Sequence, residues 1–452
     1  MQGGHVIQQF TAAEYREYLA SGQADLEVFY EQQLAYARGV QERVHPFASL
    51  DERVISLQAS HRKGERARGE PLGRLYAVPI AVEDIFDTID FPTAFGSPIH
   101  EGRYAIADAA VVRRLRDAGA VVFGKTATTE FAGDQPGPAL NPHNPDHTPG
   151  GAASGSAAAV AAGVVPLALG SQSNGSVIRA ASFCGVYGYK PSMGMLPRTG
   201  VFERSPSLDQ GGIFARCVED LALAAEIMSG DDGQDRASLG LPPRQLASLC
   251  ASEPPVEPKF CFVRTPWWDQ VDDEAREAYQ AFVELMQRAV VSAELPAVVE
   301  QAAQWHDRIT EAELAFTMQR EYINHRSRLS NELRQRIEHG LQTPVLAYLT
   351  AKDRMPHVSC AFDEYFQHYD AILSPAAFGG APSGLASTGD STPQKVWGFA
   401  GLPTLSMPLL QLSSGLPLGI QAVGPLHNDG RFLRAVRWLV NEFVKRGVHD
   451  QD

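Results

Sequence analysis

Apolar residues recur at helical spacing in several stretches of the chain. In residues 26–44 the apolar positions include Leu26, Phe29 and Tyr30, with polar residues between them. The sequence Thr-Ala-Ala-Glu at 11–14 matches the capping box that begins a helix. Acidic residues in the first turn, small-residue runs and terminal glycines indicate further helices. On these grounds we predict helices over 26–44, 52–70, 108–118, 155–162, 218–228, 272–291, 311–339 and 429–446.

Shorter apolar runs between Gly, Pro and polar residues predict strands. Gly119 separates the predicted helix 108–118 from the run 120–123, and such a succession of helix and strand is typical of a mixed α/β sheet. Residues 131–147, rich in Pro, Gly and Asn, are expected to form a long ordered loop near the mouth of a site. The predicted strands cover 76–82, 120–123, 164–169 and 261–264.

The stretch 148–191 combines two loops of Gly and Ser with a helix of small residues and a buried apolar strand. The first loop lies at the N-terminus of the predicted helix 155–162, where backbone N–H groups lack helical partners. The second loop, 170–176, follows the strand and would hold Ser176 beside several converging N–H groups. A nucleophile of acyl transfer and its oxyanion hole require this arrangement.

Five separated segments resemble the amidase-signature superfamily. Three lie in the stretch just described: TPGG at 148–151, GSAAAVA at 155–161 and GSVIR at 175–179. VPIAVED at 78–84 resembles the strand that carries the catalytic lysine in this superfamily, and GLPTLSMP at 401–408 also matches. The resemblance covers nearly the whole chain. It implies an α/β amidase-signature fold, with a central mixed β-sheet surrounded by α-helices.

The resemblance also implies which positions would be catalytic. Members of the superfamily use a serine nucleophile, a bridging serine whose peptide bond is cis, and a lysine as the ultimate base. Matched residue by residue, the nucleophile is Ser176, the bridging serine is replaced by Ala152, the next serine by Ala153, and the lysine by Glu83. Two of the three triad groups are therefore replaced.

Both replacements disable the usual proton relay. A buried lysine has a pKa of roughly 7 to 10, whereas a carboxylate starts at about 4 and rises by roughly 3 to 5 units at most. Glu83 would thus be a feeble base toward an alcohol, and Ala152 has no hydroxyl to pass a proton along. Because loss of one member can disable such a unit, ordinary amide hydrolysis is not expected.

The carbonyl-binding turn is expected to survive these replacements, because an oxyanion hole of backbone N–H groups does not depend on side chains. We place it at Ser173, Asn174, Gly175 and Ser176, where Asn174 tolerates a left-handed φ. The resemblance to a subgroup acting on small urea-like or carboxyamide compounds adds pocket positions, for which a loop around a buried tryptophan is the alternative. The further candidate substrate-binding residues are Ala152, Ser154, Phe131, Thr388, Asp390 and Trp397.

Other charged and ligand-type residues near these segments are interpreted as structural. Lys125 belongs to a Lys-Thr pair that superfamily members carry outside the triad, so a role as substitute base is the weaker interpretation. Arg179 and Lys190 are interpreted as groups that fix the loops, although Arg179 retains a role in placing an anion as an alternative. His143 and His147 lack metal-ligand spacing and are assigned to loop packing.

Composition limits the partners. The 452-residue chain has 39 Lys and Arg against 53 Asp and Glu, for a net charge of -14. This balance argues against nonspecific binding to nucleic acid or anionic membranes. The five cysteines show no zinc or disulfide spacing, and the N-terminal residues MQGGHVIQQF do not resemble a signal peptide, so a reduced cytoplasm fits best. We expect a small-molecule substrate, no metal or other cofactor, no nucleic acid, no membrane, and a homodimer as the candidate assembly.

The near-continuous resemblance favours one domain over 1–452. We divide it into outer N-terminal helices (1–70), a signature core (71–230), a variable pocket region (231–395) and a C-terminal core segment (396–452). Three functional hypotheses remain open. The first is an enzyme with a redirected site that uses Glu83 as acid or base. The second is an amide or acyl hydrolase that uses Ser176 or a water activated by Glu83. The third is an inactive member that binds a ligand or partner.

Overall fold

A single mixed sheet runs through the protein in the computed structural model, which describes residues 7–449. Among these residues the sheet has 11 strands in the order β1-β3-β2-β4-β6-β5-β10-β11-β9-β7-β8. Pairing is parallel within β3-β2-β4 and within β9-β7-β8, and antiparallel elsewhere. The strands are β1 (Phe47–Ser49), β2 (Pro79–Glu83), β3 (Val121–Thr126), β4 (Leu167–Gln172), β5 (Tyr187–Lys190), β6 (Gln210–Ala215), β7 (Phe260–Val263), β8 (Val290–Ala293), β9 (Ala371–Pro375), β10 (Thr404–Gln411) and β11 (Pro417–Val423).

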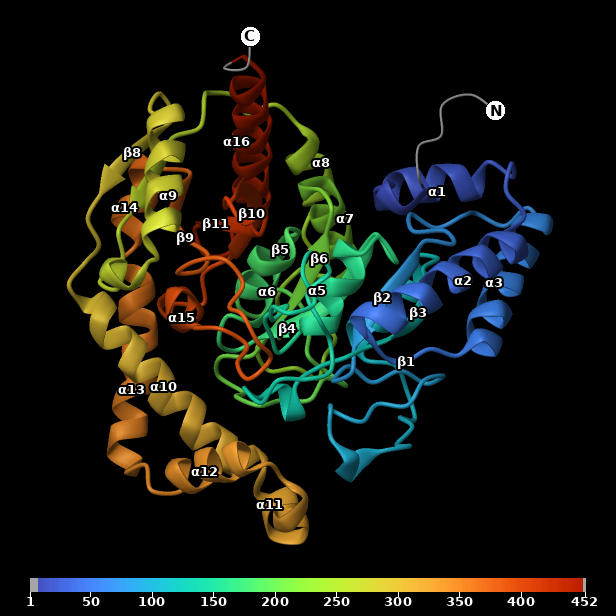
Figure 1. The fold of residues 1–452 in the computed structure, drawn as a ribbon, viewed down its shortest axis with the longest axis horizontal. Helices are drawn as coiled ribbons and strands as arrows, with labels where there is room; N and C mark the ends of the chain where they lie inside the picture. Colours follow the sequence, from blue (N-terminus) through green and yellow to red (C-terminus); the bar gives the residue numbers. More distant parts are fainter. Residues whose placement is uncertain (1–6, 450–452) are drawn as a thin grey trace.

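Helices surround this sheet. Figure 1 shows α1 to α3 at one end of the molecule, beside β2 and β3, with α9, α13 and α14 at the opposite end and α11 at the bottom of the view. The helices are α1 (Ala12–Ala20), α2 (Leu26–Val44), α3 (Glu52–Ala67), α4 (Ala110–Asp117), α5 (Ser154–Ala161), α6 (Ser176–Cys184), α7 (Val218–Met228), α8 (Ala247–Ala251), α9 (Asp273–Leu285), α10 (Val298–Thr317), α11 (Gln319–His325), α12 (Asn331–Gly340), α13 (Val345–Cys360), α14 (Asp363–His368), α15 (Thr392–Phe399) and α16 (Asp429–His449). The expected α/β architecture, a mixed sheet surrounded by helices, is confirmed.

The first two helices form where their sequence places caps. The Thr11 hydroxyl accepts a hydrogen bond from the Glu14 backbone N–H and the Glu14 carboxylate accepts one from the Thr11 N–H, which completes the predicted capping box of α1. The Asp25 carboxylate caps α2 by accepting from the Glu27 N–H, and buried apolar residues line its inner face. Local sequence therefore determines both starts.

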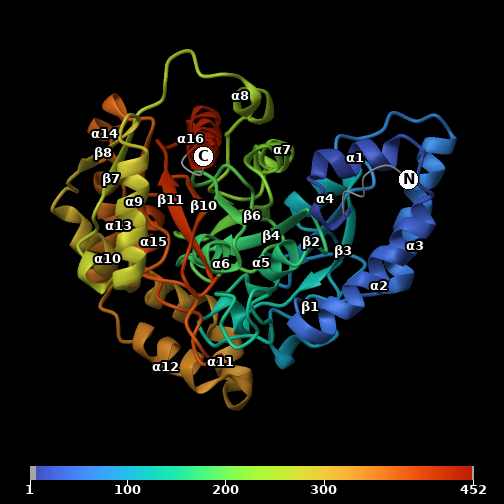
Figure 2. The same ribbon diagram turned by 45° about the horizontal axis from the view of Figure 1, so that its top comes forward.

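The centre of the sheet brings the signature segments together. Strands β2 and β4 are parallel neighbours, so their carboxyl ends meet at one edge of the sheet, where Glu83 ends β2. Helix α5, made of small residues, packs beside the ends of two strands: a Cβ atom at Gly155 would lie 2.2 Å from the carbonyl oxygen of Pro46, just before β1, and 2.5 Å from the backbone nitrogen of Ala127, just after β3. Figure 2 shows α5 and α6 beside the middle strands. Small residues thus allow the two signature helices to approach the sheet closely.

Several predicted boundaries are wrong. The apolar run 164–169 is not the strand itself, because β4 begins at Leu167 and extends through Gln172, where its polar residues pair with β6. The helix predicted over 272–291 ends at Leu285, and β8 follows it. The helix predicted over 311–339 is divided among α10, α11 and α12. Lys125 lies within β3 rather than after it.

No helix in residues 7–449 combines the length and the apolar character that crossing a bilayer requires. The expectation that the N-terminus is not a signal peptide concerns residues 1–10, and residues 1–6 lie outside the described part.

Candidate functional site

Glu83 is a buried carboxyl group held at the end of β2. The Thr128 hydroxyl donates to its Oε1 at 2.7 Å, and the Ser171 backbone N–H donates to its Oε2 at 2.8 Å. Glu83 is 0% exposed. Burial raises its pKa to about 7, because the loss of hydration outweighs the two donors, which favour the ionised form. The group can therefore bind or release a proton near neutral pH.

Thr128 links this carboxyl group to the first signature loop. Its hydroxyl oxygen lies 3.3 Å from the carbonyl oxygen of Ala152. The peptide bond between Gly151 and Ala152 is cis, as the resemblance implies for the bridging position. The side chain at this position is a methyl group, and both Ala152 and Ala153 are buried. Glu83 thus lies one hydroxyl away from the position matched to the bridging serine.

The second signature loop is a tight connection between β4 and α6. Gly175 has φ +84°, the left-handed conformation, and Ser176 is the first residue of the helix. Gln172 caps the helix, because its Oε1 accepts from the N–H groups of Val177 and Ile178 at 2.9 and 3.0 Å. Gly175, and not Asn174, supplies the positive φ of this turn, so the tolerance of Asn174 for a left-handed φ is not used.

Four N–H groups of this loop remain available. Among the described residues, the backbone N–H groups of Ser173, Asn174, Gly175 and Ser176 make no hydrogen bond. His306 Nε2 donates to the carbonyl oxygen of Ser173 at 2.8 Å and so fixes the other side of the turn. The free N–H groups lie at the N-terminal end of α6, where the helix dipole favours negative charge. This geometry suits a carbonyl or carboxylate oxygen.

Arg179 follows Ser176 by three residues on α6. Its Nη2 donates to the Gly151 carbonyl oxygen at 2.7 Å and to the Thr388 hydroxyl at 3.2 Å. The guanidinium therefore connects the first signature loop, α6 and the segment around Thr388. These contacts agree with the interpretation that Arg179 fixes loops.

The remaining candidate residues are Ser154, Phe131, Asp390 and Trp397. Ser154 is buried as the first residue of α5, and Phe131 packs against Phe95 and Phe202 with ring centroids 6.2 and 5.4 Å apart. Asp390 is exposed and accepts from the Thr392 N–H at 2.7 Å. Trp397 is buried in an apolar cluster with its ring 5.1 Å from that of Phe362. Among the described residues, neither Asp390 nor Trp397 forms a side-chain hydrogen bond with the serine loop. Thr388 is connected to α6 through its hydrogen bond with Arg179.

Sequence reasoning missed several groups that build the site. Thr128 and Ser171 hold Glu83, Gln172 caps α6, and His306 contacts the turn from α10. Gln394 of α15 also reaches the turn, since a Cβ atom at Gly175 would lie 2.6 Å from its Oε1. No spacing rule in the sequence announces these contacts.

Lys125 does not serve Glu83 or Ser176. Its Nζ donates to the Thr93 hydroxyl at 2.6 Å and lies 3.3 Å from Oδ1 of Asp84, fully buried. Burial lowers the pKa of Lys125 to about 8, against the attraction of Asp84. The amine is engaged away from the serine loop, which agrees with its interpretation as a structural residue.

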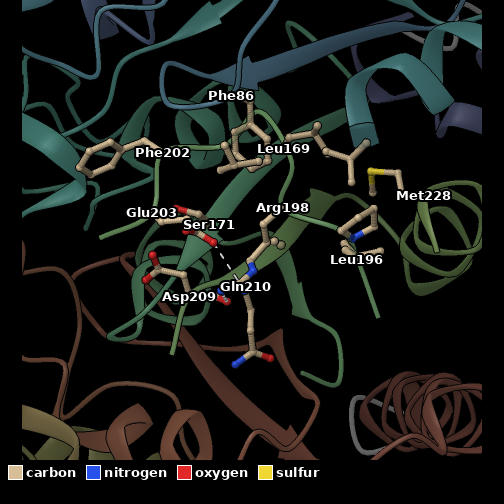
Figure 3. A pocket seen from close by; sticks show the side chains of 15 residues that line it. Phe86, Leu169, Ser171, Leu196, Arg198, Phe202, Glu203, Asp209, Gln210 and Met228 are labelled. Carbon is tan, nitrogen blue, oxygen red and sulfur yellow. Dashed lines mark hydrogen bonds and ion pairs between the residues drawn. The ribbon is translucent and has the colours of Figure 1, made fainter. Parts of the chain in front are cut away.

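A second buried carboxyl group, that of Asp209, interacts with the serine loop through Ser173. Asp209 accepts from the backbone N–H groups of Arg204 and Ser205 at 2.6 and 2.8 Å. Burial raises the pKa of Asp209 to about 6, against the hydrogen bonds of Ser173 and of these two residues. Asp209 and Ser171 line the same pocket (Figure 3).

The two loop histidines bind different carbonyl groups. His143 Nε2 lies 3.0 Å from the Cys184 carbonyl oxygen and His147 Nδ1 lies 2.6 Å from that of Ala381. Within residues 7–449, no three His, Cys, Asp or Glu side chains gather as a metal site would require. The two side chains connect this loop to the segments that carry those carbonyl groups.

Comparison with known proteins shows the class to which this fold and site belong. The Amidase family model matches residues 30–433, so the chain belongs to the amidase family. The chain is 31% identical to a subunit of the Glutamyl-tRNA(Gln) amidotransferase of Picosynechococcus sp., covering 93% of this chain and 95% of that protein. It is 30% identical to the corresponding protein from Thermotoga maritima, covering 82% and 86%.

Solved structures agree with this membership. One solved structure matches with 28% identity and a TM-score of 0.89 over 96% of this chain and 98% of that one. It is described as a vestigial protein complex that reveals the evolutionary origins of an s-triazine catabolic enzyme. The structure of the Thermotoga maritima protein matches with 27% identity and a TM-score of 0.79 over 96% and 95%.

These relatives correct the expected partners. The expectation of no partner beyond a small-molecule substrate and a possible second copy of the chain is wrong, because the relatives are named as subunits and a subunit functions with other polypeptides. The charge argument excluded only nonspecific electrostatic binding. It carried no information about a specific protein interface, whose overall composition resembles that of the remaining surface.

Proposed function

We propose that this chain is an amidase-family enzyme with a redirected site that acts on a small carbonyl or amide compound. Glu83 transfers a proton to or from the substrate. The N–H groups of Asn174, Gly175 and Ser176 hold the carbonyl oxygen, and the Ser176 hydroxyl orients the substrate. In this assignment, backbone N–H groups bind the carbonyl oxygen, which requires no particular side chains, and Glu83 alone carries out the proton transfer.

The environment of Glu83 carries this proposal. A carboxyl group with a pKa of about 7 is matched to general acid or base catalysis at neutral pH. It is poorly matched to removing a proton from a serine hydroxyl, and the methyl group of Ala152 offers no relay between the two. A substrate group or a water more acidic than an alcohol suits Glu83 better.

Labelling of Ser176 by a fluorophosphonate tests the proposal without a known substrate. The unaltered chain should react slowly, whereas the double variant Glu83→Lys/Ala152→Ser, which restores the family's groups, should react at least about 10³-fold faster. Adding Ser176→Ala to that variant should abolish labelling, and circular dichroism verifies that each variant is folded. Rapid labelling of Ser176 in the unaltered chain would show that it is a serine hydrolase after all.

In a turnover assay, substitutions of Glu83 and of Ser176 should reduce kcat to different extents. Glu83→Gln should reduce kcat by about 10²- to 10⁴-fold, the usual contribution of a positioned acid or base, while Ser176→Ala retains more activity. If Glu83 acts as a base, the rate rises with pH through about 7, as its carboxyl group ionises. A larger loss for Ser176→Ala than for Glu83→Gln would contradict the assignment.

We also propose that the chain functions with a different polypeptide as its partner. The relatives named as amidotransferase subunits support this, as does the solved neighbour described through a protein complex.

A further inference from the structure

The carboxyl group of Glu83 is fully buried, so its proton is exchanged through the groups that contact it. An acid or base must return to its starting protonation state after each turnover. Thr128 and Ser171 donate to the two oxygens of Glu83 from different segments. These two residues are therefore the first steps of any path for the proton that avoids the substrate.

Ser171 connects Glu83 to a small internal cavity. Its backbone N–H donates to Oε2 of Glu83 at 2.8 Å, and its hydroxyl also donates to this carboxyl group. Ser171 lines the cavity together with Asp209 and several apolar side chains. The cavity offers about 10 Å³ to the centre of a water molecule, which is enough for one water. In Figure 3, Ser171 and Asp209 lie toward one side of the view and Met228 toward the other.

Asp209 presents an unused acceptor. Its Oδ2 accepts from the N–H groups of Arg204 and Ser205 at 2.6 and 2.8 Å. Its Oδ1 is buried and has no hydrogen-bond partner within the described part of the chain. Such an atom is costly without a partner, and internal water commonly supplies one. A water in the cavity would have the Ser171 hydroxyl and Oδ1 of Asp209 as polar partners.

The charged groups around Asp209 are engaged elsewhere. Nη2 of Arg198 lies 3.0 Å from Oδ1 of Asp235 and 3.5 Å from Oε1 of Glu203, while its Nη1 donates to the backbone carbonyl oxygen of Asp209. Glu313, on α10, accepts from the Ser205 hydroxyl at 2.6 Å. Glu203 lines the cavity and its side chain is 43% exposed. The cavity thus borders on a carboxylate in contact with solvent.

Glu83 and Asp209 hold a proton with similar affinity. Burial raises the pKa of Glu83 to about 7 and that of Asp209 to about 6. The acid next to Glu83 in the chain, Asp84, is paired with Lys125 at 3.3 Å. Neither Glu83 nor Asp209 has such a cation within 4.0 Å among the described residues. A proton shared between them favours Glu83 by a factor of only about ten.

We infer that Asp209 is the proton-exchange partner of Glu83, and that protons pass between them through the Ser171 hydroxyl and one water molecule in this cavity. The Ser171 oxygen takes the proton of neutral Glu83 and gives its own to the water, which delivers one proton to Oδ1 of Asp209. Glu83 ends as a carboxylate and Asp209 as a carboxylic acid, so protons and charge balance. The inference rests on the proposed function for the role of Glu83, and Asp209 acts through Glu83 without touching the substrate.

The rate of proton exchange at Glu83 tests this path without a substrate. After a pH jump across about 7, the infrared C=O band of the carboxyl group, identified by its loss in Glu83→Gln, reports the protonation of Glu83 in the full chain. Asp209→Asn keeps an acceptor for the Arg204 and Ser205 N–H groups but cannot take the proton, so exchange should become at least about 10-fold slower. Ser171→Ala removes the hydroxyl, keeps the backbone donor to Glu83, and should slow exchange similarly.

Thr128→Val is the matched comparison, because Thr128 donates to the other oxygen of Glu83 and does not line the cavity. It removes a donor that favours the ionised form, so it should raise the pKa of Glu83 without slowing exchange. Exchange at the unaltered rate in Asp209→Asn or in Ser171→Ala would overturn the inference, and either variant decides if the other fails to fold. Equal slowing by Thr128→Val would overturn it as well.

Turnover of Glu83→Gln separates this inference from the proposed function. Slow exchange in Asp209→Asn and Ser171→Ala, together with full turnover by Glu83→Gln, would leave the path in place and reject the proposed proton chemistry. Fast exchange in both variants, together with loss of turnover in Glu83→Gln, would keep that chemistry and reject the path.

Discussion

At the scale of single residues, the site combines the buried carboxyl group of Glu83 with the buried methyl group of Ala152. Glu83 is accommodated because Thr128 and Ser171 donate to its two oxygens, so the strand end is satisfied without a cation. A buried carboxyl group with two donors still prefers to be neutral, because hydration is lost. Near neutral pH this carboxyl group therefore exchanges between its neutral and ionised forms.

This preference makes stability depend on pH. The pKa of Glu83 is about 7 in the folded chain against 4.5 as a reference, so between these values the folded state binds the extra proton. The free energy of unfolding should fall as pH rises from about 4.5 to 7 and stay lower above 7. The free energy of unfolding falls by about 3 kcal/mol in total, because each pH unit between the two pKa values corresponds to about 1.4 kcal/mol.

Urea unfolding across pH 5 to 8 measures this dependence. Glu83→Gln cannot titrate, so its stability relative to the unaltered chain should increase with pH by most of that amount. Glu31→Gln, on the exposed face of α2, should leave the dependence as it is. A constant difference between the unaltered chain and Glu83→Gln would mean that residue 83 keeps an ordinary pKa.

At the scale of elements, predictions succeeded where local sequence decides the structure. The capping box of α1 and the periodic apolar residues of α2 determined those helices, and α2 and α7 have the predicted bounds. Strand limits depend on distant partners instead. Apolar residues marked burial at 164–169, but pairing with β6 carries β4 to Gln172, where side chains are polar.

The same distinction applies to the site. Glu83, Ala152 and Ser176 were predictable because each lies in a segment that resembles the family. The contacts of Thr128, Arg179 and His306 were not predictable, because they join segments between 24 and 133 residues apart. Tertiary packing determines such contacts, and periodicity carries no information on them.

The cap of α6 is the element-scale feature that holds the serine turn. Gln172→Ala removes the acceptor of the Val177 and Ile178 N–H groups and should lower the free energy of unfolding by about 1 kcal/mol. Chemical denaturation measures the change. Gln319→Ala, exposed on α11, should stay within about 0.5 kcal/mol. An unchanged midpoint for Gln172→Ala would show that the free N–H groups find other acceptors.

At the scale of the whole molecule, the sheet collects the site from most of the chain. Glu83 comes from β2, Ser176 from the start of α6, and Thr388 from the segment between β9 and α15. The amidase family match spans 30–433 in the same way. A relative that matches over nearly its whole length is named as a subunit, so a partner would bind on the outer surface of this shared fold. The charge and composition of the chain do not reveal the position of such an interface.

Isolation from the source cells tests the partner at this scale. Purified under native conditions through a terminal tag, the chain should elute with a second, different polypeptide in a fixed stoichiometric ratio that persists through two further separations. The recombinant chain alone should bind that polypeptide, produced separately, with one saturable transition, and should then unfold at a higher Tm because ligands of the folded state stabilise it. A point variant at the buried Ser176 should bind it equally well, since this side chain is 8% exposed. Elution as one chain, or as copies of this chain alone, would contradict the proposal.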